Sequence, residues 1–231
     1  MPIIGPRHTI TLDDDRYPPL LRESPDPPPE LSVVGDPAVL ASHVAVALTG
    51  ARRCSPYGLR CAHEAGELIA TAGLPLVTGG AVGVQAGAIE GALAYHKRCI
   101  VVLGSGIDQP YPECHAGLFQ RVVDCGGAIV SPWPDHMPPR PCHFRWRNEV
   151  ITRMSCCLVL IEAGAPSGSF SMADETLKLD RAVLAFPGQI YASASAGCNS
   201  LIADGDAVCI DSIQRLADWL SIIRSDYAIN D

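Results

Sequence analysis

Short runs of apolar residues, each about as long as one strand, alternate along the chain with segments of helical spacing. The expected strands cover residues 44–49, 76–78, 99–103, 128–131, 157–161, 183–186 and 208–210. The expected helices cover residues 57–71, 84–95, 116–124, 147–154, 171–179 and 212–223. Apolar strands of this kind, separated by helices, are typical of a mostly parallel sheet covered on both faces. The pattern therefore predicts a doubly wound α/β fold with helices on both faces of the sheet.

The first 42 residues are rich in proline, which removes backbone donors and disfavours helical geometry in the preceding residue. They are expected to form a mostly irregular lead-in packed on the core. Residues 43–231 are expected to form one Rossmann-like domain. A chain of 231 residues is long enough for one such domain with a buried core.

The formal net charge of −8 excludes a general coat for nucleic acid, because such proteins gain affinity from concentrated positive charge. A local basic pocket remains possible on this acidic chain, since arginines cluster at 52–53 and between 140 and 153. No run approaches the roughly 18–20 apolar residues needed to cross a bilayer. No basic and apolar leader opens the chain. A cytoplasmic protein without a membrane partner is therefore expected.

Ten cysteines are scattered through the chain, many of them in apolar runs. They are expected to be mostly reduced core residues, because no export signal precedes them. There is no C-x-x-C pair, and the neighbours Cys114-His115 and Cys142-His143 are far apart in sequence. We therefore predict no metal site.

Glycine-rich loops follow several of the expected strands, where a parallel sheet binds its ligands. Gly79, Gly80 and Gly83 follow one strand and precede a helix, so their amides could hold an anion. The pattern does not match the full dinucleotide fingerprint, and no cofactor is predicted. A purely structural role in a tight turn has equal weight at this stage.

Two further segments are candidates for binding a strand. Ser167, Gly168 and Ser169 precede an expected helix, where hydroxyls and amides suit a phosphate. Capping of that helix by Ser169 or Ser171 is the alternative. The segment 144–148 interleaves aromatic residues with arginines, which suits stacked bases and phosphates. A helix start with a buried aromatic side chain is the competing interpretation.

Catalytic motifs are missing from the sequence. There is no Gly-x-Ser-x-Gly elbow, no Walker lysine and no His-Glu-x-x-His pair. Asp108 and Glu162 are both expected near strand ends, which leaves a paired-carboxylate hydrolase open. The alternatives are a turn residue for Asp108 and a hydrogen bond to loop amides for Glu162. No catalytic residue is assigned, and the chain is expected not to be an enzyme.

Taken together, the motifs resemble those of the DprA/Smf family of DNA-processing proteins, from Tyr17 to about Asp211. The matching segments, in order, are Tyr17 to Leu21, Pro29 to Gly35, Thr49 to Arg53, Ser55 to Gly58, Gly104 to Asp108, Tyr111-Pro112, Phe144 with Arg147-Asn148, Glu162-Ala163, Ser167 to Ser169, Pro187-Gly188, and Gly197 to Gly205.

This resemblance implies a homodimer that binds single-stranded DNA in a basic pocket. It also implies that the protein protects incoming DNA and helps to load the RecA recombinase in natural transformation. By the resemblance, Arg52 would contact phosphate, and Gly50 and Gly79 would let the strand approach. The full expected site is Gly50, Arg52, Arg53, Gly79, Gly80, Gly83, Gly104, Gly106, Arg145, Arg147, Asn148, Ser167, Gly168 and Ser169.

The chain departs from the family pattern within the same loops. Val82, Glu149 and Asp174 each stand where the family usually has an arginine. The other departures are Gln85 for an aspartate, Ile89 for a histidine and His115 for an asparagine. Losing positive charge and adding carboxylates should weaken phosphate binding.

Two other functions therefore remain open. One is a Rossmann-like sensor of a nucleotide ligand, or a nucleoside-phosphate hydrolase, that has lost DNA binding. The other is an interaction scaffold, for which the last expected helix offers Ile213, Leu216, Leu220 and Ile223 at helical spacing. Core packing is the simpler explanation of those four residues.

Overall fold

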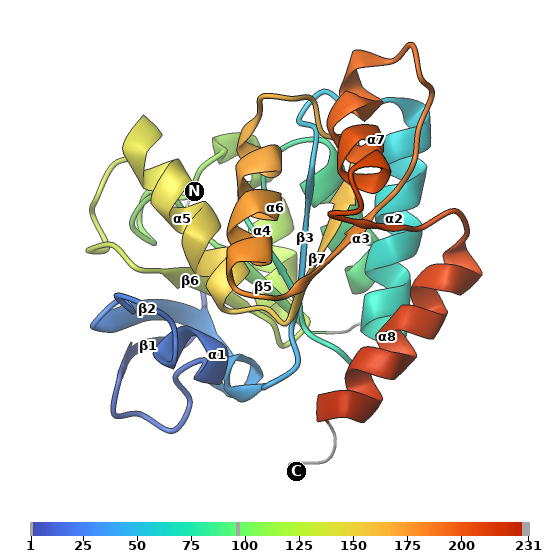
Figure 1. Cartoon of the computed structure of the whole chain (residues 1–231). Coiled ribbons are helices and arrows are strands. Elements are labelled where there is room, and N and C mark those ends of the chain that lie inside the picture. Colours follow the sequence, from blue (N-terminus) through green and yellow to red (C-terminus); the bar gives the residue numbers. More distant parts are fainter. Residues whose placement is uncertain (1, 96–97, 228–231) are drawn as a thin grey trace.

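Nine strands form one sheet in the order β1-β2-β6-β5-β4-β3-β7-β8-β9 (Figure 1). The computed structural model describes residues 2–95 and 98–227. The strands are β1 (Arg7–Thr11), β2 (Glu30–Gly35), β3 (Val46–Gly50), β4 (Leu76–Thr78), β5 (Cys99–Val102), β6 (Ala128–Ser131), β7 (Cys157–Ile161), β8 (Ala182–Ala185) and β9 (Val208–Cys209).

Eight α-helices accompany the sheet in the described part of the chain, together with three short 3-10 helices. The α-helices are α1 (Pro19–Arg22), α2 (Pro56–Thr71), α3 (Val84–Leu93), α4 (Ala116–Asp124), α5 (Pro141–Arg153), α6 (Gly168–Lys178), α7 (Ala196–Ala203) and α8 (Ile213–Tyr227). The 3-10 helices are η1 (Pro37–Ala41), η2 (Glu113–His115) and η3 (Ser193–Ser195).

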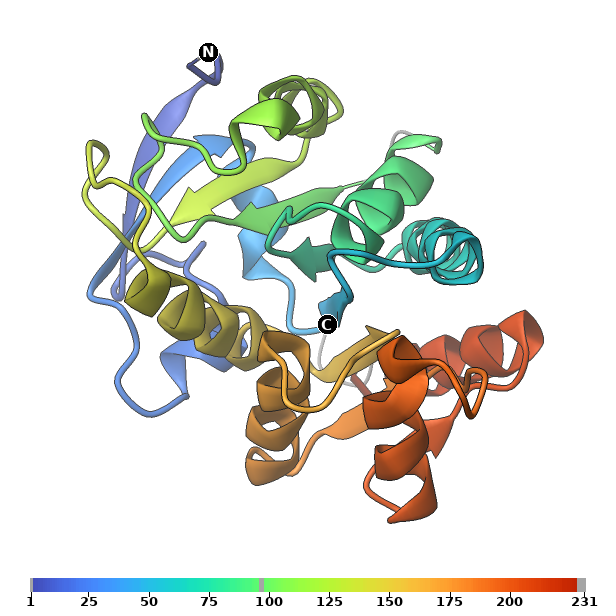
Figure 2. The ribbon, with the colours of Figure 1, turned by 90° about the horizontal axis from the view of Figure 1, so that it is seen from above.

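The seven strands from β6 to β9 in this order pair in parallel, and all seven were expected from the sequence. Side chains alternate between two apolar layers along each strand. In β3, Val46 and Leu48 face a layer shared with α2, α3, α4 and α8. Ala47 faces the layer shared with α1, α5, α6 and α7. Figure 2 shows the two groups of helices on opposite sides of the sheet, which confirms the doubly wound α/β fold.

The expectation of a mostly irregular lead-in is wrong. Residues 7–11 and 30–35 form β1 and β2, which pair with each other in antiparallel fashion, and β2 continues the sheet antiparallel to β6. Leu31 and Val33 are buried on one side of β2, as period-two alternation allows. The prolines lie outside these two strands, so they do not interrupt the ladder.

Three helices differ from the sequence-based expectation, and one of them, α1, is a four-residue helix in the segment expected to be irregular. Helix α5 begins at Pro141, six residues before the expected start, because proline at the first helical position needs no amide partner. Helix α7 was not expected at all. It is eight residues long and begins with Ala196-Gly197-Cys198, a segment with weak helical periodicity.

Candidate functional site

The sheet changes its winding direction at β3, which has β4 on one side and β7 on the other. In open α/β sheets, the loops at the carboxyl ends of two such strands diverge and leave a crevice between them. Three cavities, of about 630, 280 and 90 Å³, lie here and share Arg52 and Arg147. We call these three cavities together the cleft.

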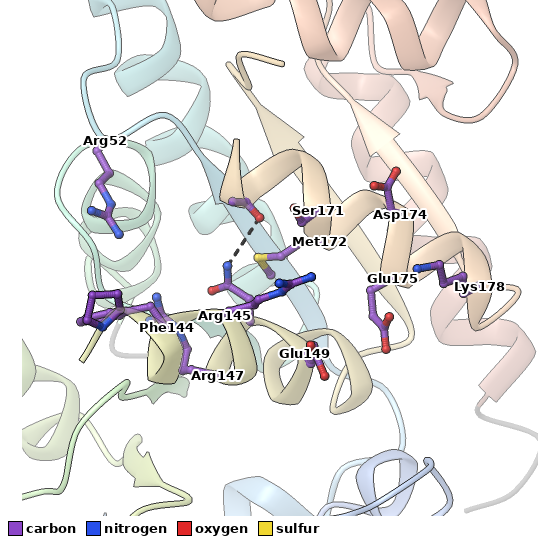
Figure 3. Close-up of a pocket in the computed structure, with 13 residues that line it drawn as sticks. Arg52, Phe144, Arg145, Arg147, Glu149, Ser171, Met172, Asp174, Glu175 and Lys178 are labelled. Atoms are coloured by element: carbon purple, nitrogen blue, oxygen red, sulfur yellow. Dashed lines mark hydrogen bonds between the residues drawn. The ribbon is translucent and has the colours of Figure 1, made fainter. Parts of the chain in front are cut away.

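The largest of the three cavities lies between α5 and α6 (Figure 3). Its lining residues include Arg52, Arg145, Arg147, Asn148, Glu149, Gly168, Asp174, Glu175 and Lys178. The middle cavity lies at the ends of β3 and β7 and includes Thr49, Gly50, Gln85, Glu162, Ser167, Gly168 and Ser169 in its lining. The smallest includes Gly79, Val82, Tyr111, Pro112 and Phe144.

Three cations of the cleft are exposed and have no carboxylate partner in the described part of the chain. They are Arg52, Arg145 and Lys178. Arg52 lines all three cavities and is therefore the one exposed cation, among the residues described, that every part of the cleft shares. Its guanidinium group is therefore available to an anion bound in the part of each cavity that it lines.

Carboxylates line the same cleft, but two of them are already engaged. Glu149 and Glu175 each accept a hydrogen bond from the Arg153 guanidinium, at 3.1 Å in both cases. Asp174 is exposed and forms no ion pair with a described residue. Of the three replacements expected to weaken phosphate binding, Glu149 and Asp174 lie in the largest cavity and Val82 lies in the smallest. Glu149 shares the positive charge of Arg153 with Glu175.

Arg147 is only 3% exposed and is held from below by the sheet. Its Nη1 donates to the carbonyl oxygens of Gly79 at 2.6 Å and Val102 at 3.1 Å, while Nε has no hydrogen-bond partner in the part of the chain that the structure describes. Burial, with a smaller contribution from the nearby Arg52, lowers the pKa of Arg147 to about 10. The group remains charged at neutral pH, so Arg147 presents a desolvated positive charge at the base of the cleft.

An apolar wall stands beside these arginines. The rings of Tyr111 and Phe144 lie 5.4 Å apart between centroids, tilted by 60°. The guanidinium carbon of Arg147 lies 5.6 Å from the centroid of Phe144, within the range of a cation–π contact. Val82 and Pro112 complete the wall. Planar apolar groups fit such a surface.

Uncharged polar groups form the floor between β3 and β7. Ser169 Oγ donates to the Gly50 carbonyl at 3.0 Å, and Gln85 Nε2 donates to Thr49 Oγ1 at 2.8 Å. Ser167 Oγ accepts from the amide of Phe170 at 3.1 Å and caps α6. Capping of this helix was the alternative considered from the sequence, but by Ser169 or Ser171 rather than by Ser167. The amino end of α6 faces the middle cavity.

Three glycines of these loops, Gly50, Gly79 and Gly104, are required by contacts within the chain itself. A Cβ atom at Gly50 would overlap the carbonyl oxygen of Ile161, and one at Gly79 would overlap Nη1 of Arg147. Gly104 leaves room for the Phe144 ring, which would lie 2.6 Å from a Cβ. Their contact with a DNA strand stays a prediction.

Nine of the fourteen expected site residues line the cleft: Gly50, Arg52, Gly79, Arg145, Arg147, Asn148, Ser167, Gly168 and Ser169. The other five are outside its lining. Arg53 is exposed, Gly80 packs on Phe119, and Gly83 has φ of 82° at the start of α3. Gly104 packs on Phe144, and Gly106 packs on the carbonyl groups of Pro134 and Asp135.

The sequence did not assign several residues that do line the cleft. Tyr111 and Phe144 were noted in motifs, but only the structure shows that their rings meet. Lys178 lies on the last turn of α6, at the far end of the largest cavity. Its spacing of four from Asp174 places both on one helix face, which was the available signal.

Asp108 and Glu162 do not form a carboxylate pair. Asp108 pairs with Arg7 at 2.6 Å and with His136 at 2.9 Å, beyond the end of β5. Glu162 follows β7 and accepts hydrogen bonds from the amide of Ser55, at 2.8 Å, and from its hydroxyl. Strands β4 and β3 separate β5 from β7, which places the two segments roughly 14 Å apart at normal strand spacing. The hydrogen bond to a loop amide that was considered for Glu162 is confirmed.

The two Cys-His neighbours have other contacts. His115 Nδ1 lies 2.8 Å from the Gly80 carbonyl oxygen, and His143 stacks on Trp133 with 3.9 Å between ring centroids. Within residues 2–95 and 98–227, no three His, Cys, Asp or Glu side chains gather as metal ligands would. None of the described helices combines the length and apolarity needed to cross a bilayer.

Residues 8–221 match the family model described as DNA recombination-mediator protein A, which includes almost all of the sheet and the whole cleft. The chain belongs to this family. Its similarity to the DprA/Smf proteins, expected from the motifs, is thereby confirmed. Protein Smf of Escherichia coli is 36% identical over 198 residues, which cover 86% of this chain and 53% of that protein.

Two solved structures of the DprA/Smf family have the same fold. DNA processing protein A of Helicobacter pylori is 27% identical with a TM-score of 0.86, and the match covers 98% of this chain and 100% of that one. The protein from Streptococcus pneumoniae is 30% identical with a TM-score of 0.81, covering 90% of this chain and 72% of that one. The chain spans about half the length of the first curated relatives it matches.

Proposed function

We propose that this chain is a DprA-type DNA-processing protein whose cleft binds single-stranded DNA. The observation that carries the proposal is the position of Arg52, which is exposed, common to all three cavities of the cleft, and without a carboxylate partner among the described residues. The Helicobacter pylori structure, which this chain matches over nearly its whole length, concerns the single-stranded DNA binding mode of that protein.

The chemistry of the cleft supports a strand rather than a duplex. Phosphates are bound by Arg52 and Arg145 on the exposed side, with the buried charge of Arg147 below them. Unpaired bases stack on the wall made by Tyr111 and Phe144, because every base offers a flat face to an aromatic ring. A duplex keeps its bases stacked on one another and cannot use that wall.

The cleft carries less positive charge than the usual family pattern would give it. Asp174 remains an uncompensated carboxylate on the cavity wall, and Val82 supplies no charge near Arg52. We therefore expect binding that is strongest at low salt and falls as salt is added, since each phosphate contact releases counterions.

The experiment that tests this proposal is a titration of labelled oligo-dT, followed by anisotropy at two salt concentrations. Arg52→Ala should weaken binding and reduce the slope of log K against log salt by about 0.7, the value for one phosphate contact on a single strand. Arg60→Ala is the matched control, because Arg60 is an exposed arginine that pairs with Glu64 on α2. Failure of the wild type to bind even at low salt would overturn the proposal.

We further propose that the protein forms a homodimer, protects the bound strand and helps to load a RecA recombinase, acting by binding without turnover. These roles are the ones that the resemblance to the DprA/Smf family implies. The chain covers about half the length of the first curated relatives it matches. Sedimentation velocity tests the dimer. Recombinase assembly on coated single strands, with and without this protein, tests loading, and no acceleration would refute it. Release of a product from DNA or from a panel of nucleotides would refute the absence of turnover.

A further inference from the structure

A fourth cavity, of about 690 Å³, lies beside the cleft on the other side of Glu162. We call it the side cavity. It lies between the start of α2 and the loop that follows β8. Its lining residues are Ser55, Pro56, Tyr57, Glu162, Pro187, Gly188, Gln189, Ala192, Ala194 and Ser195. Glu162 also lines the middle cavity of the cleft, so the two spaces share one wall.

The lining of the side cavity differs from that of the cleft in charge. Among the described residues, its lining includes no lysine or arginine, and Glu162 is its one carboxylate. Phosphate is disfavoured there because no cation would balance its charge. An uncharged ligand with hydrogen-bond donors is favoured. Both oxygens of Glu162 already accept from Ser55, but each has a second lone pair.

The loop beside the side cavity exposes large apolar side chains that lie outside the cavity lining. Ile190 and Tyr191 are 81% and 96% exposed, in the loop between the lining residues Gln189 and Ala192. Tyr57 is 47% exposed, and its hydroxyl donates to the Pro187 carbonyl at 2.7 Å, which fixes one side of the loop to α2. An aromatic ring exposed to this degree beside a cavity provides a surface on which a flat ligand can stack.

We propose that the side cavity receives a nucleobase of the strand that the cleft holds, with Tyr191 stacked against that base. This inference rests on the proposed function. The charge distribution favours a nucleic acid strand over a peptide. One ligand must present phosphates to Arg52 and an uncharged ring beyond Glu162, and a strand alternates these two groups along its length.

The first test is an abasic scan with the full chain. Oligo-dT strands that carry one abasic site, moved one position at a time, are titrated at low salt. For the wild type, we expect affinity to fall at the positions over the Tyr111 and Phe144 wall. We also expect it to fall about tenfold at one further position, the size expected when one stacked base is lost.

Tyr191→Ala should remove the effect of that further position and leave the others unchanged. The variant should fold normally because the side chain is almost fully exposed. Tyr95→Ala is the matched control, since Tyr95 is a half-exposed tyrosine between α3 and β5, at the amino ends of the central strands and away from the side cavity. Ala192→Trp, which places a large ring in the cavity, should have the same effect as Tyr191→Ala.

The outcomes separate this inference from the proposed function. If the wild type binds strands but no position outside the cleft responds to an abasic site, the side cavity takes no base. The same conclusion follows if Tyr191→Ala and the wild type give identical scans. If the wild type binds no strand at all, the proposed function fails first and the base site fails with it.

Discussion

Adding a single methyl group at Gly79 tests whether the buried arginine of the cleft is held as the structure indicates. In Gly79→Ala, the new Cβ would overlap Nη1 of Arg147, so the guanidinium group must leave its position. It then loses its hydrogen bonds to the carbonyl groups of Gly79 and Val102. The side chain can reach water because Arg147 also lines the open cavities of the cleft.

Two opposing effects determine how much Gly79→Ala changes the free energy of unfolding. Two hydrogen bonds from a charged donor contribute about 3–6 kcal/mol together. Burial lowers the pKa of Arg147 from 12.5 to about 10, which disfavours its charged form by about 3 kcal/mol, and this cost is relieved when the group reaches water. The free energy of unfolding should therefore fall by about 2 kcal/mol, and Tm by about 4–8 °C. Single-strand affinity should fall about tenfold, the loss of one charge-assisted contact.

Thermal melts and oligo-dT titrations of the same preparations provide the measurement. Gly117→Ala is the control, because a Cβ at Gly117 in α4 meets no atom of the described residues within 4 Å. It should raise stability slightly, as alanine does in a helix. In an Arg147→Ala background, Gly79→Ala should cost little, since the overlapping group is gone. An equal loss of stability in both backgrounds would refute the reasoning.

Three further predictions concern single side chains. Glu162→Gln should lower Tm by a few degrees in a thermal melt, because it weakens the acceptor that holds Ser55 at the start of α2; an unchanged Tm would contradict this. Asp174→Asn should strengthen single-strand binding at low salt and have less effect at high salt, measured by anisotropy. The hydrogen bonds from Arg16 hold the pKa of Asp14 at about 2, below its usual 3.8. The ionised carboxylate of Asp14 therefore stabilises the folded state above pH 4, and this contribution is lost as the pH falls to 2. Denaturant titrations of Asp14→Asn should show a smaller loss over that range than the wild type.

Much of the sheet could be predicted because its strands are continuous apolar runs. Runs such as residues 157–161 are buried on both faces, so tertiary contacts and local pattern agree. Strands β1 and β2 were missed because the surrounding prolines dominated the interpretation of the lead-in. The alternation of Leu31, Val33 and their polar neighbours was the signal that could have revealed β2.

The loops of the site could also be predicted, but the roles of their residues could not. A glycine after a strand indicates close approach, and the sequence cannot tell whether a ligand or a side chain approaches. At Gly79, the neighbour is Arg147, which is 68 residues away along the chain. The side cavity could not be predicted from the sequence because the segments that line it, the start of α2 and the loop after β8, are far apart along the chain.

The pairing of β2 with β6 is delayed while the chain is being synthesised. Strand β2 ends at Gly35, but its partner β6 begins only at Ala128, so more than ninety residues must follow before the two can pair. At synthesis rates of about 5–20 residues per second, the delay is roughly 5–20 s. Throughout that interval, Ile10, Leu31 and Val33 have no finished core to cover them. During synthesis, the β1-β2 pair therefore keeps these three side chains exposed on one face until β6 is available.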